Sequence, residues 1–410
     1  SLVGSEMCIR DRRHLTLRLE TTMTGRYPDG DFYGFEQDLS AEELAILHKV
    51  RDWTHEKVRP IATEYWNRSE FPHELLPSIQ ELDIISLVRH QGRSHLLAGL
   101  VTAEIHRADA SVGTFFSGQD GLFTGSIELL ASEEQKERWL PDIYAVKKTG
   151  VFAITEPDAG SDVAQDMSTT ATKVDGGWIL NGAKRWIGNA TWSDYVIIWA
   201  RDPEDNHVKG FLVDTSWEGY EATLMQNRIS IRAVQNAEIT LKDVFVPDDY
   251  KLAHANTFKD TNKVLKSARS TVGWQAVGLQ MGVLDTALDY TTNRTQFGKP
   301  LASFQINQSK LSTILGNLIA SESMMAALAR LESRGETRGE HSALAKAHVS
   351  KLMRESAALG RELLGGNGII SDYTAAKHFC DAEAIYSYEG TFDINQLVAA
   401  RSITGMSAFV

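Results

Sequence analysis

A single glutamate near the end of the chain has the neighbours that a catalytic base needs. Glu389 follows Tyr386 and Tyr388 and precedes Gly390 and Thr391, in the stretch IYSYEGTFDINQLVAARSITG. Aromatic neighbours exclude water, which disfavours the ionised carboxylate and raises its pKa toward the working pH. A glycine lets the main chain approach a substrate closely. By itself, a glutamate before a glycine is equally typical of a solvated turn, because an exposed charge needs no partner.

Four further stretches could contact an anionic or flat ligand. Residues 152–164, FAITEPDAGSDVA, can offer hydroxyl and main-chain N–H donors. Residues 184–190, KRWIGNA, add a tryptophan that could cover a flat ring, and residues 294–305, RTQFGKPLASFQ, add an arginine able to bind phosphate. The glycines of residues 363–369, LLGGNGI, allow a close approach of the backbone, but their spacing is not that of a dinucleotide fold. Each stretch alone also fits an ordinary turn or helix end.

The composition bounds the class of protein. The chain has 410 residues, of which 42% are hydrophobic and 23% charged, as in a globular protein of two or three domains. The net charge of −12 argues against nucleic acid or an anionic membrane as the main partner, and no apolar run looks long enough to cross a bilayer. Cys8 and Cys380 give neither a disulfide framework nor a metal cluster, and the histidines are scattered. We therefore predict no metal site.

The spacing of apolar residues divides the chain into three domains. Residues 38–150 show helical spacing, residues 151–252 form short β-rich runs, and residues 260–410 return to three long helical segments and a shorter pair, with Glu389 between the pair. We predict a mainly α fold with an N-terminal helical domain, a small antiparallel, barrel-like β-domain and a C-terminal four-helix bundle. Residues 1–22 are Arg-rich and are interpreted as an artefact or non-native leader, with an organelle transit peptide as the alternative.

Three local signals predict where elements begin and end. Ser40 followed by Glu43 is a capping box for the first helix. Ser132 is expected to cap a later helix, which Pro141 is expected to end. In GGWILNGAKRWIGNA the pair at residues 181–182, Asn-Gly, predicts a hairpin turn between two strands.

The order and spacing of TEPDAGSD, RWIGN, RTQFGKPL, LGGNG and YEGT resemble the acyl-CoA dehydrogenase family over residues 38–410. Within the family, GRELLGGNGI and VQNAEITLKDVFVPDD resemble the branch of glutaryl-CoA dehydrogenases and plant short-chain acyl-CoA oxidases. The resemblance implies FAD held between the β-domain and the bundle of a homotetramer. It also implies an acyl-CoA substrate that is oxidised to a trans-2-enoyl-CoA, with Glu389 as the catalytic base. Electrons would pass to an electron-transfer flavoprotein or, as in the oxidases, to O₂.

The resemblance also assigns binding roles to other positions. Residues expected to contact FAD are Phe152, Ile154, Thr155, Gly160, Ser161, Trp186, Ile187, Gly188, Arg294, Phe297, Gln305, Gly365, Gly366, Thr391 and Asp393. Residues expected to contact the substrate are Ser161, Arg269, Gly390 and Arg401. The group from Arg294 to Gln305, together with the two glycines, would reach the adenine half of FAD from a neighbouring subunit.

Departures from the family's pattern bear on the acceptor and the substrate. Gly188 stands where many dehydrogenases have a threonine and where oxidases tend to have glycine, so both acceptors stay open. His106 and Gly113 stand where glutaryl enzymes place an acidic residue and an arginine, which favours an uncharged acyl chain. A bulky Trp274 suggests a short or medium chain, although it could equally be bundle core. Glu362 replaces a frequent glutamine beside the expected flavin contact.

One alternative belongs to a different class of protein. A non-catalytic helical scaffold with the same fold would bind no flavin and would make no use of Glu389. For the compartment, the few cysteines fit a reducing environment, and a start at Met23 without a targeting signal predicts a bacterial-type cytoplasmic enzyme. The mitochondrial matrix and the peroxisome are the alternatives.

Overall fold

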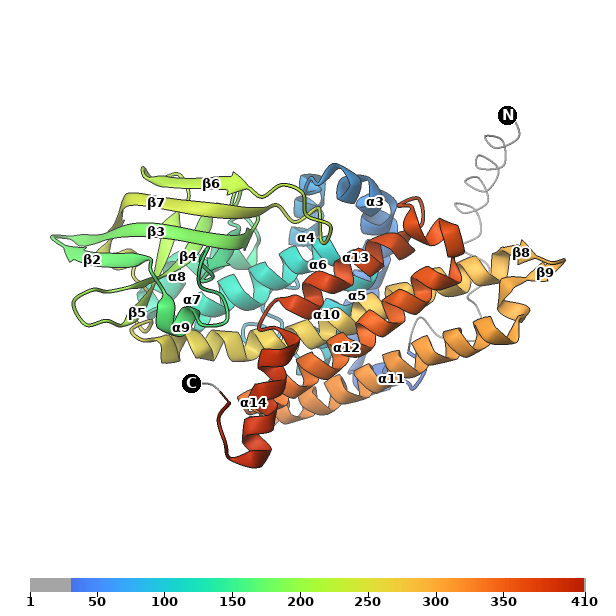
Figure 1. The fold of residues 1–410 in the computed structure, drawn as a ribbon. Coiled ribbons are helices and arrows are strands. Elements are labelled where there is room, and N and C mark those ends of the chain that lie inside the picture. Colours follow the sequence, from blue (N-terminus) through green and yellow to red (C-terminus); the bar gives the residue numbers. More distant parts are fainter. Residues whose placement is uncertain (1–30, 409–410) are drawn as a thin grey trace.

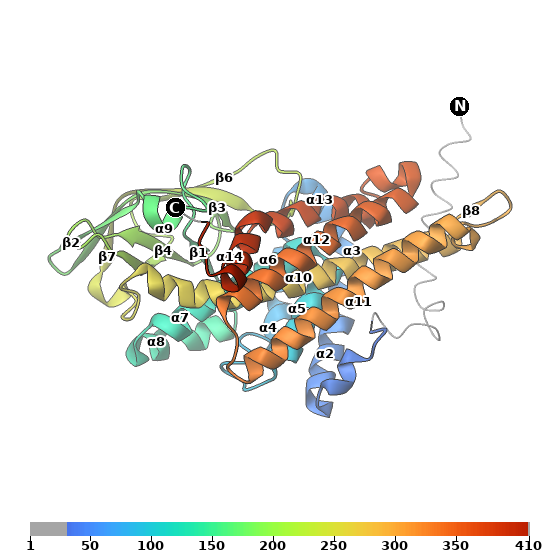
Figure 2. The same cartoon turned by 60° about the horizontal axis from the view of Figure 1, so that its bottom comes forward.

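The computed structural model describes residues 31–408, so the leader interpreted at residues 1–22 lies outside the described residues. A β-domain lies at one end of an elongated molecule, and the long helices of the C-terminal bundle extend away from it (Figure 1). The N-terminal helices lie against both parts, as the second view also shows (Figure 2). The predicted mainly α fold with a middle β-domain is confirmed.

Seven α-helices form the N-terminal part. They are α2 (Ala41–Trp53), α3 (Arg59–Arg68), α4 (Leu76–Leu82), α5 (His95–Ala108), α6 (Ala110–Ser117), α7 (Gly125–Leu130) and α8 (Glu133–Tyr144). The predicted capping box is present at α2, where Ser40 Oγ accepts from Glu43 N and the Glu43 carboxylate accepts from Ser40 N. The prediction that Pro141 ends α8 is wrong, because α8 continues to Tyr144. Pro141 faces solvent, where water can hydrate the carbonyl that loses its helical partner.

The β-domain is one seven-stranded sheet. Its strands are β1 (Gly150–Ala153), β2 (Thr170–Val174), β3 (Gly177–Gly188), β4 (Tyr195–Arg201), β5 (Val208–Asp214), β6 (Tyr220–Leu224) and β7 (Asn236–Pro247). Their order is β1-β4-β2-β3-β7-β6, and β5 pairs with β4. Most pairs are antiparallel, but β1 runs parallel to β4, which corrects the expectation of a purely antiparallel sheet. Parallel pairing requires a long connection, and a loop and other strands separate β1 from β4.

The predicted hairpin turn at Asn181 and Gly182 is wrong, because β3 passes straight through these residues as one strand. The pair forms a bulge against β7, and Gly182 has a φ of 144°. The Asn181 side chain exchanges two hydrogen bonds with Asp243 on β7, at 2.9 and 2.8 Å, which secures the bulge. The turn between β2 and β3 lies instead at Gly176, where φ is 72°.

The C-terminal bundle begins with the longest helix of the described chain. The bundle helices are α10 (Phe258–Asn293), α11 (Gln305–Ser333), α12 (Gly339–Leu363), α13 (Thr374–Ser387) and α14 (Phe392–Thr404). With 36 residues, α10 is about 54 Å long and runs from beneath the β-domain to a small hairpin of β8 (Thr295–Gln296) and β9 (Lys299–Pro300) (Figure 1). It packs against α5, α11, α12 and α13. The three predicted long helices and the shorter pair are therefore confirmed.

One continuous core joins the N-terminal helices to the bundle, and two smaller clusters support the β-domain. The joint between α5 and α10 depends on two glycines. A Cβ on Gly278 of α10 would overlap the Ala103 carbonyl oxygen of α5, and a Cβ on Gly99 of α5 would overlap the Trp274 indole. Trp274 is 3% exposed and is therefore part of this core.

One helix of the described part, α11, is long and apolar enough to cross a bilayer by length and composition alone. This corrects the expectation that no apolar run reaches that length. In the fold α11 packs against α10 and α12 as a member of the bundle. A bundle helix meets the same criterion, so the criterion does not by itself indicate a membrane span.

We expect Gly278→Ala to destabilise the protein by about 1–3 kcal/mol, because the new methyl group must push α10 away from the α5 backbone. The midpoint of urea unfolding measures the change. Gly339→Ala is the matched control, since no atom lies within 4 Å of the added Cβ at the start of α12, and its midpoint should stay close to that of the wild type. Equal midpoints for the two variants would contradict the tight crossing.

Candidate active site

Glu389 lies where the sequence placed it, at the joint between α13 and α14. Glu389 and Gly390 both have left-handed backbone conformations, with φ of 57° and 84°. The rings of Tyr386 and Phe392 stack beside the joint, with centroids 5.3 Å apart. Thr391 Oγ1 accepts from Ile394 N at 3.3 Å and so caps α14. The predicted aromatic, sharply turned setting is therefore present in the described structure.

The electrostatic surroundings of Glu389 come from two other helices. Its side chain is half-buried, and this burial raises the pKa of its carboxyl group above the ordinary value. The positive charges of Arg269 on α10 and Lys346 on α12 oppose that rise. A carboxylate in this setting can ionise and yet remain a better base than a solvated glutamate.

Lys346 is a residue that the sequence reasoning missed. Its side chain is fully buried, and its ammonium group contacts the main chain of the Glu389 turn. A signal was available, because Lys346 shares a helical stripe with the buried Ser342, Val349 and Met353. A buried lysine charge is costly unless it is hydrogen-bonded or paired with an opposite charge. A lysine within a buried helical stripe is therefore a candidate for a functional position.

The loop after β1 is fixed by a buried ion pair. Lys184 Nζ on β3 lies 2.8 Å from Glu156 Oε1, and both side chains are buried. The other Glu156 oxygen accepts from the amide and hydroxyl of Ser168, at 2.6 and 2.7 Å. Burial alone would raise the pKa of Glu156, but Lys184 and these donors lower it to about 2. The pair therefore anchors the segment that contains the expected cofactor contacts Thr155 and Ser161.

Several expected cofactor residues of the β-domain form an open surface. Trp186 is 55% exposed at a φ of 65°, and a Cβ on Gly160 would meet open space. Thr155 is half-buried, and its carbonyl accepts from Arg185 N at 2.8 Å. Phe152 and Ile154 are partly buried against a core cluster, Gly160 and Ser161 are exposed, and Ile187 is buried within the β-domain. Because the Ile187 side chain packs in the core, only the main chain of Ile187 could contact a ligand.

The loop between β6 and β7 joins this surface to the helix that leads to Glu389. Ile231 N donates to Asp381 Oδ1 at 2.6 Å, and Ala384 N donates to Ser230 Oγ at 3.2 Å. The end of β3 pairs with the start of β7, next to this loop. The structure therefore brings the Trp186 end of β3 toward α13 and the Glu389 turn.

A second group of expected cofactor residues lies at the other end of α10, around the β8–β9 hairpin (Figure 1). Phe297 is 94% exposed, and Gly365 and Gly366 are exposed beyond the end of α12. Asn367 Nδ2 donates to the Tyr290 hydroxyl at 2.9 Å, which ties the glycines to α10. Other members of this end are Arg294, Gln305 and Glu362, which pairs with Lys310 at 2.6 Å. One chain therefore does not bring this group together with Trp186.

The expected substrate arginines differ in position. Arg269 is half-buried on α10 and acts on the Glu389 carboxylate. Arg401 is exposed in the last turn of α14, and Asp393 is exposed in its first turn. Ser161 is exposed before the short helix α9 (Val163–Asp166). Only Arg269 is thus tied to the Glu389 turn by an interaction within the described chain.

The residues at the glutaryl-type positions are packed together and carry no positive charge. His106 is fully buried, and burial lowers its pKa to about 4, so it is neutral near pH 7. A Cβ on Gly113 would overlap the His106 ring. These two positions therefore offer no cation to a distal carboxylate.

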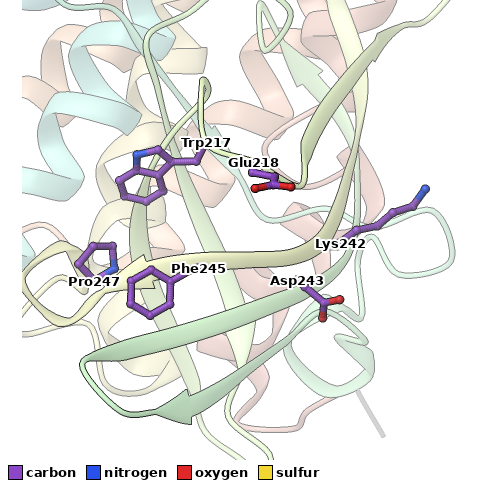
Figure 3. A pocket seen from close by; sticks show the side chains of 6 residues that line it. All are labelled: Trp217, Glu218, Lys242, Asp243, Phe245 and Pro247. Atoms are coloured by element: carbon purple, nitrogen blue, oxygen red, sulfur yellow. The ribbon is translucent and has the colours of Figure 1, made fainter.

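An open groove on the β-domain is separate from these residues. Trp217, Phe245 and Pro247 lie on one side of it, and the charged Lys242 and Asp243 lie on the other (Figure 3). Glu218 completes the lining. None of the expected catalytic, cofactor or substrate residues lines this groove, so it does not belong to the candidate site.

Three family models match consecutive parts of the chain. They are the acyl-CoA dehydrogenase N-terminal domain over residues 40–147, the middle domain over residues 151–244 and the C-terminal domain over residues 258–404. The chain is also 30% identical, over 372 residues, to the mitochondrial short-chain specific acyl-CoA dehydrogenase of Bos taurus. That match covers 87% of this chain and 90% of the relative.

Two solved structures are similar along their whole length. A glutaryl-CoA dehydrogenase from Mycobacterium smegmatis in complex with FADH2 has a TM-score of 0.90 and 30% identity, covering 94% of this chain and 100% of the other. Butyryl-CoA dehydrogenase from Megasphaera elsdenii has a TM-score of 0.85 and 27% identity, covering 89% and 99%.

We expect Lys184→Met to destabilise the protein by about 3–5 kcal/mol, because it leaves the Glu156 carboxylate buried without its cation. Urea unfolding measures this, and replacing both members with apolar residues should recover part of the loss. Lys173→Met is the matched control, because the Lys173–Asp248 pair is exposed and its removal should cost less than about 1 kcal/mol. Similar losses for the two lysines would contradict the anchoring role.

Proposed function

The chain belongs to the acyl-CoA dehydrogenase family, and from this premise we propose that it oxidises an acyl-CoA thioester between Cα and Cβ. The proposed product is the trans-2-enoyl-CoA, and the proposed base is Glu389. The observation that carries the proposal is the setting of this carboxylate: a half-buried side chain on a left-handed turn, beside two cations and stacked aromatic rings.

FAD is the proposed cofactor, and the residues present fit it. An exposed tryptophan on a strand is the kind of surface that a flat ring can cover, and Trp186 is such a residue. Open space in front of Gly160 and Gly366 leaves room for a ligand to approach the backbone. Trp186 and Thr155 would hold the isoalloxazine half. When bound, FAD supplies the acceptor for the hydride that leaves the substrate.

Glu389 has the proposed role of removing the α-proton of the thioester. Such a base must lie within about 3 Å of the proton that it takes, and a fixed turn supplies that precision. The Gly390 main chain can approach the thioester carbonyl, where an N–H donor would stabilise the developing negative charge; the loss of such a donor typically costs about 3 kcal/mol. Arg269 is proposed to contact the CoA moiety and Arg401 to lie near it.

A short or medium, uncharged acyl chain is the proposed substrate class. The neutral, buried His106 and the Gly113 packed against it provide no charge for a distal carboxylate, which would be costly to bury unpaired. Trp274 fills the space between α5 and α10 and limits the volume there. The similarity to a short-chain relative and to a butyryl-CoA dehydrogenase supports the same proposal.

A homotetramer is the proposed assembly. The Arg294–Gln305 segment lies at the far end of α10 from the β-domain, as Figure 1 shows. A flavin resting on Trp186 would therefore meet Arg294, Phe297 and the glycines of a neighbouring copy. The strong exposure of Phe297 in the single chain supports this proposal.

An electron-transfer flavoprotein is the proposed acceptor, and O₂ is the alternative that one observation favours. A Cβ on Gly188 would lie 2.9 Å from Val234 Cγ1, so a threonine does not fit there without movement of the loop. The hydroxyl that many dehydrogenases place near the reactive nitrogen of the flavin is absent here, because residue 188 is a glycine. An acyl-CoA oxidase with the same base and cofactor is consistent with this feature.

We expect butyryl-CoA to bleach the flavin of the purified holoprotein under anaerobic conditions, and glutaryl-CoA to do so more slowly. Glu389→Gln should lower the reduction rate at least about 100-fold, because the base is lost, while FAD remains bound. Stopped-flow absorbance measures both. Glu383→Gln, which removes a partly exposed carboxylate of α13, is the control and should keep the wild-type rate. A wild-type flavin that no acyl-CoA reduces would refute the proposed function.

We expect the reduced enzyme to react slowly when air is admitted and rapidly when an electron-transfer flavoprotein is added. The return of flavin absorbance, together with a peroxide assay, distinguishes the acceptors. Fast reoxidation by air with one peroxide formed per substrate would select the oxidase instead.

A further inference from the structure

The main chain on both sides of Glu389 is held by side chains from other elements. Glu389 adopts a left-handed conformation, which is rare for a residue other than glycine and persists only where the surroundings enforce it. The contacts that enforce it therefore decide where the carboxylate points.

Lys346 supplies the first of these contacts from α12. Its ammonium group donates to the Tyr386 carbonyl oxygen at 2.7 Å and to the Gly390 carbonyl oxygen at 2.8 Å. These two carbonyls lie on opposite sides of Glu389 in the chain. The Lys346 side chain has no exposed surface, so its charge is desolvated as well as positioned.

Asn395 supplies the second contact from the first turn of α14. Its Nδ2 lies 3.4, 2.8 and 3.1 Å from the carbonyl oxygens of Glu389, Gly390 and Thr391. Asn395 is fully buried, and a Cβ on Gly390 would lie 3.0 Å from its Nδ2. Glycine at position 390 thus permits the close approach of this amide to the turn.

A third contact fixes the residue before the base. The Tyr388 hydroxyl donates to Gln275 Oε1 on α10 at 2.6 Å. Helices α10, α12 and α14 therefore each hold one part of the turn. The turn that contains Glu389 is therefore held by hydrogen bonds to three helices that are far apart or adjacent in the sequence.

On the basis of the function proposed above, we propose that Lys346 and Asn395 are positioning residues that hold the Glu389 carboxylate in its working geometry. We further propose that the Lys346 ammonium, together with Arg269, stabilises the ionised form of this carboxylate. Asn395 contributes geometry alone, because its amide carries no charge. The two residues therefore have separable effects.

The charged groups near the turn support the separation between the charge effect of Lys346 and the geometric effect of Asn395. Arg269 from α10 and Lys346 from α12 both lower the pKa of Glu389 against the rise that burial causes, and the Tyr388 phenol is the titratable group on the preceding residue. Burial lowers the pKa of Lys346 to about 8. The charge of Arg269 contributes to this lowering, whereas the charge of Glu389 opposes it. Lys346 therefore carries its charge below about pH 8, where an ionised Glu389 is needed.

The first test is the pH dependence of flavin reduction by saturating butyryl-CoA, measured on FAD-loaded Lys346→Met, Lys346→Arg and Asn395→Leu. The rate should rise with pH as Glu389 ionises. Lys346→Met should move this rise by about one pH unit to higher pH, since an opposite charge at close range is lost. Lys346→Arg should restore the wild-type midpoint, and Asn395→Leu should lower the rate up to about 100-fold without moving the midpoint. Lys351→Met, an exposed lysine of the same helix, is the control for both effects.

The second test does not depend on turnover. Hydrogen exchange of the amides in residues 386–395 should become faster in Lys346→Met and in Asn395→Leu, and should stay at the wild-type rate in Lys351→Met. A wild-type midpoint and wild-type protection in Lys346→Met would overturn the inference, as would a shifted midpoint in Asn395→Leu. Failure of every acyl-CoA to reduce the wild-type flavin would instead refute the proposed function. The exchange rates would then still show whether Lys346 and Asn395 hold the Glu389 turn. If Lys346→Met does not fold, Lys346→Arg and Asn395→Leu carry the test.

Discussion

The close crossing of α5 and α10 is the contact on which the other parts of this molecule depend. Gly278 lets the α10 backbone lie against the Ala103 carbonyl, and Gly99 receives the Trp274 indole. Because α10 also packs against α11, α12 and α13, this crossing fixes the bundle relative to the N-terminal helices. It also sets the positions of Arg269 and Gln275, the two α10 residues that act on the Glu389 turn.

As the proposed base, Glu389 would have to satisfy two opposing requirements. A strong base must be partly removed from water, yet a dry carboxylate tends to hold its proton. The fold meets both by burying the turn and placing cations from α10 and α12 beside it. The cost of burying the Lys346 charge is offset by its two carbonyl contacts, so the same contacts serve charge and geometry.

The residues proposed to bind the cofactor and substrate are divided between the two ends of one long helix. Trp186 and Glu389 lie toward the β-domain, whereas Arg294 and Phe297 lie around the hairpin at the far end (Figure 1). Exposed aromatic and glycine surfaces at both ends would be covered in an assembly that brings them together. This division is the reason that the proposed cofactor site would be completed by a neighbouring copy.

The sequence by itself determined the helical and β-rich regions, the Ser40 capping box and the position of Glu389 between two helices, because these depend on local spacing and short motifs. Only the tertiary structure decided that Asn181 and Gly182 form a bulge, since β7 pairs across them and Asp243 binds the asparagine. It also decided the contacts that Lys346 and Asn395 make with the Glu389 turn. Their partners are main-chain carbonyls, which every residue carries, so the buried helical stripe could mark Lys346 as a candidate but could not identify what it binds.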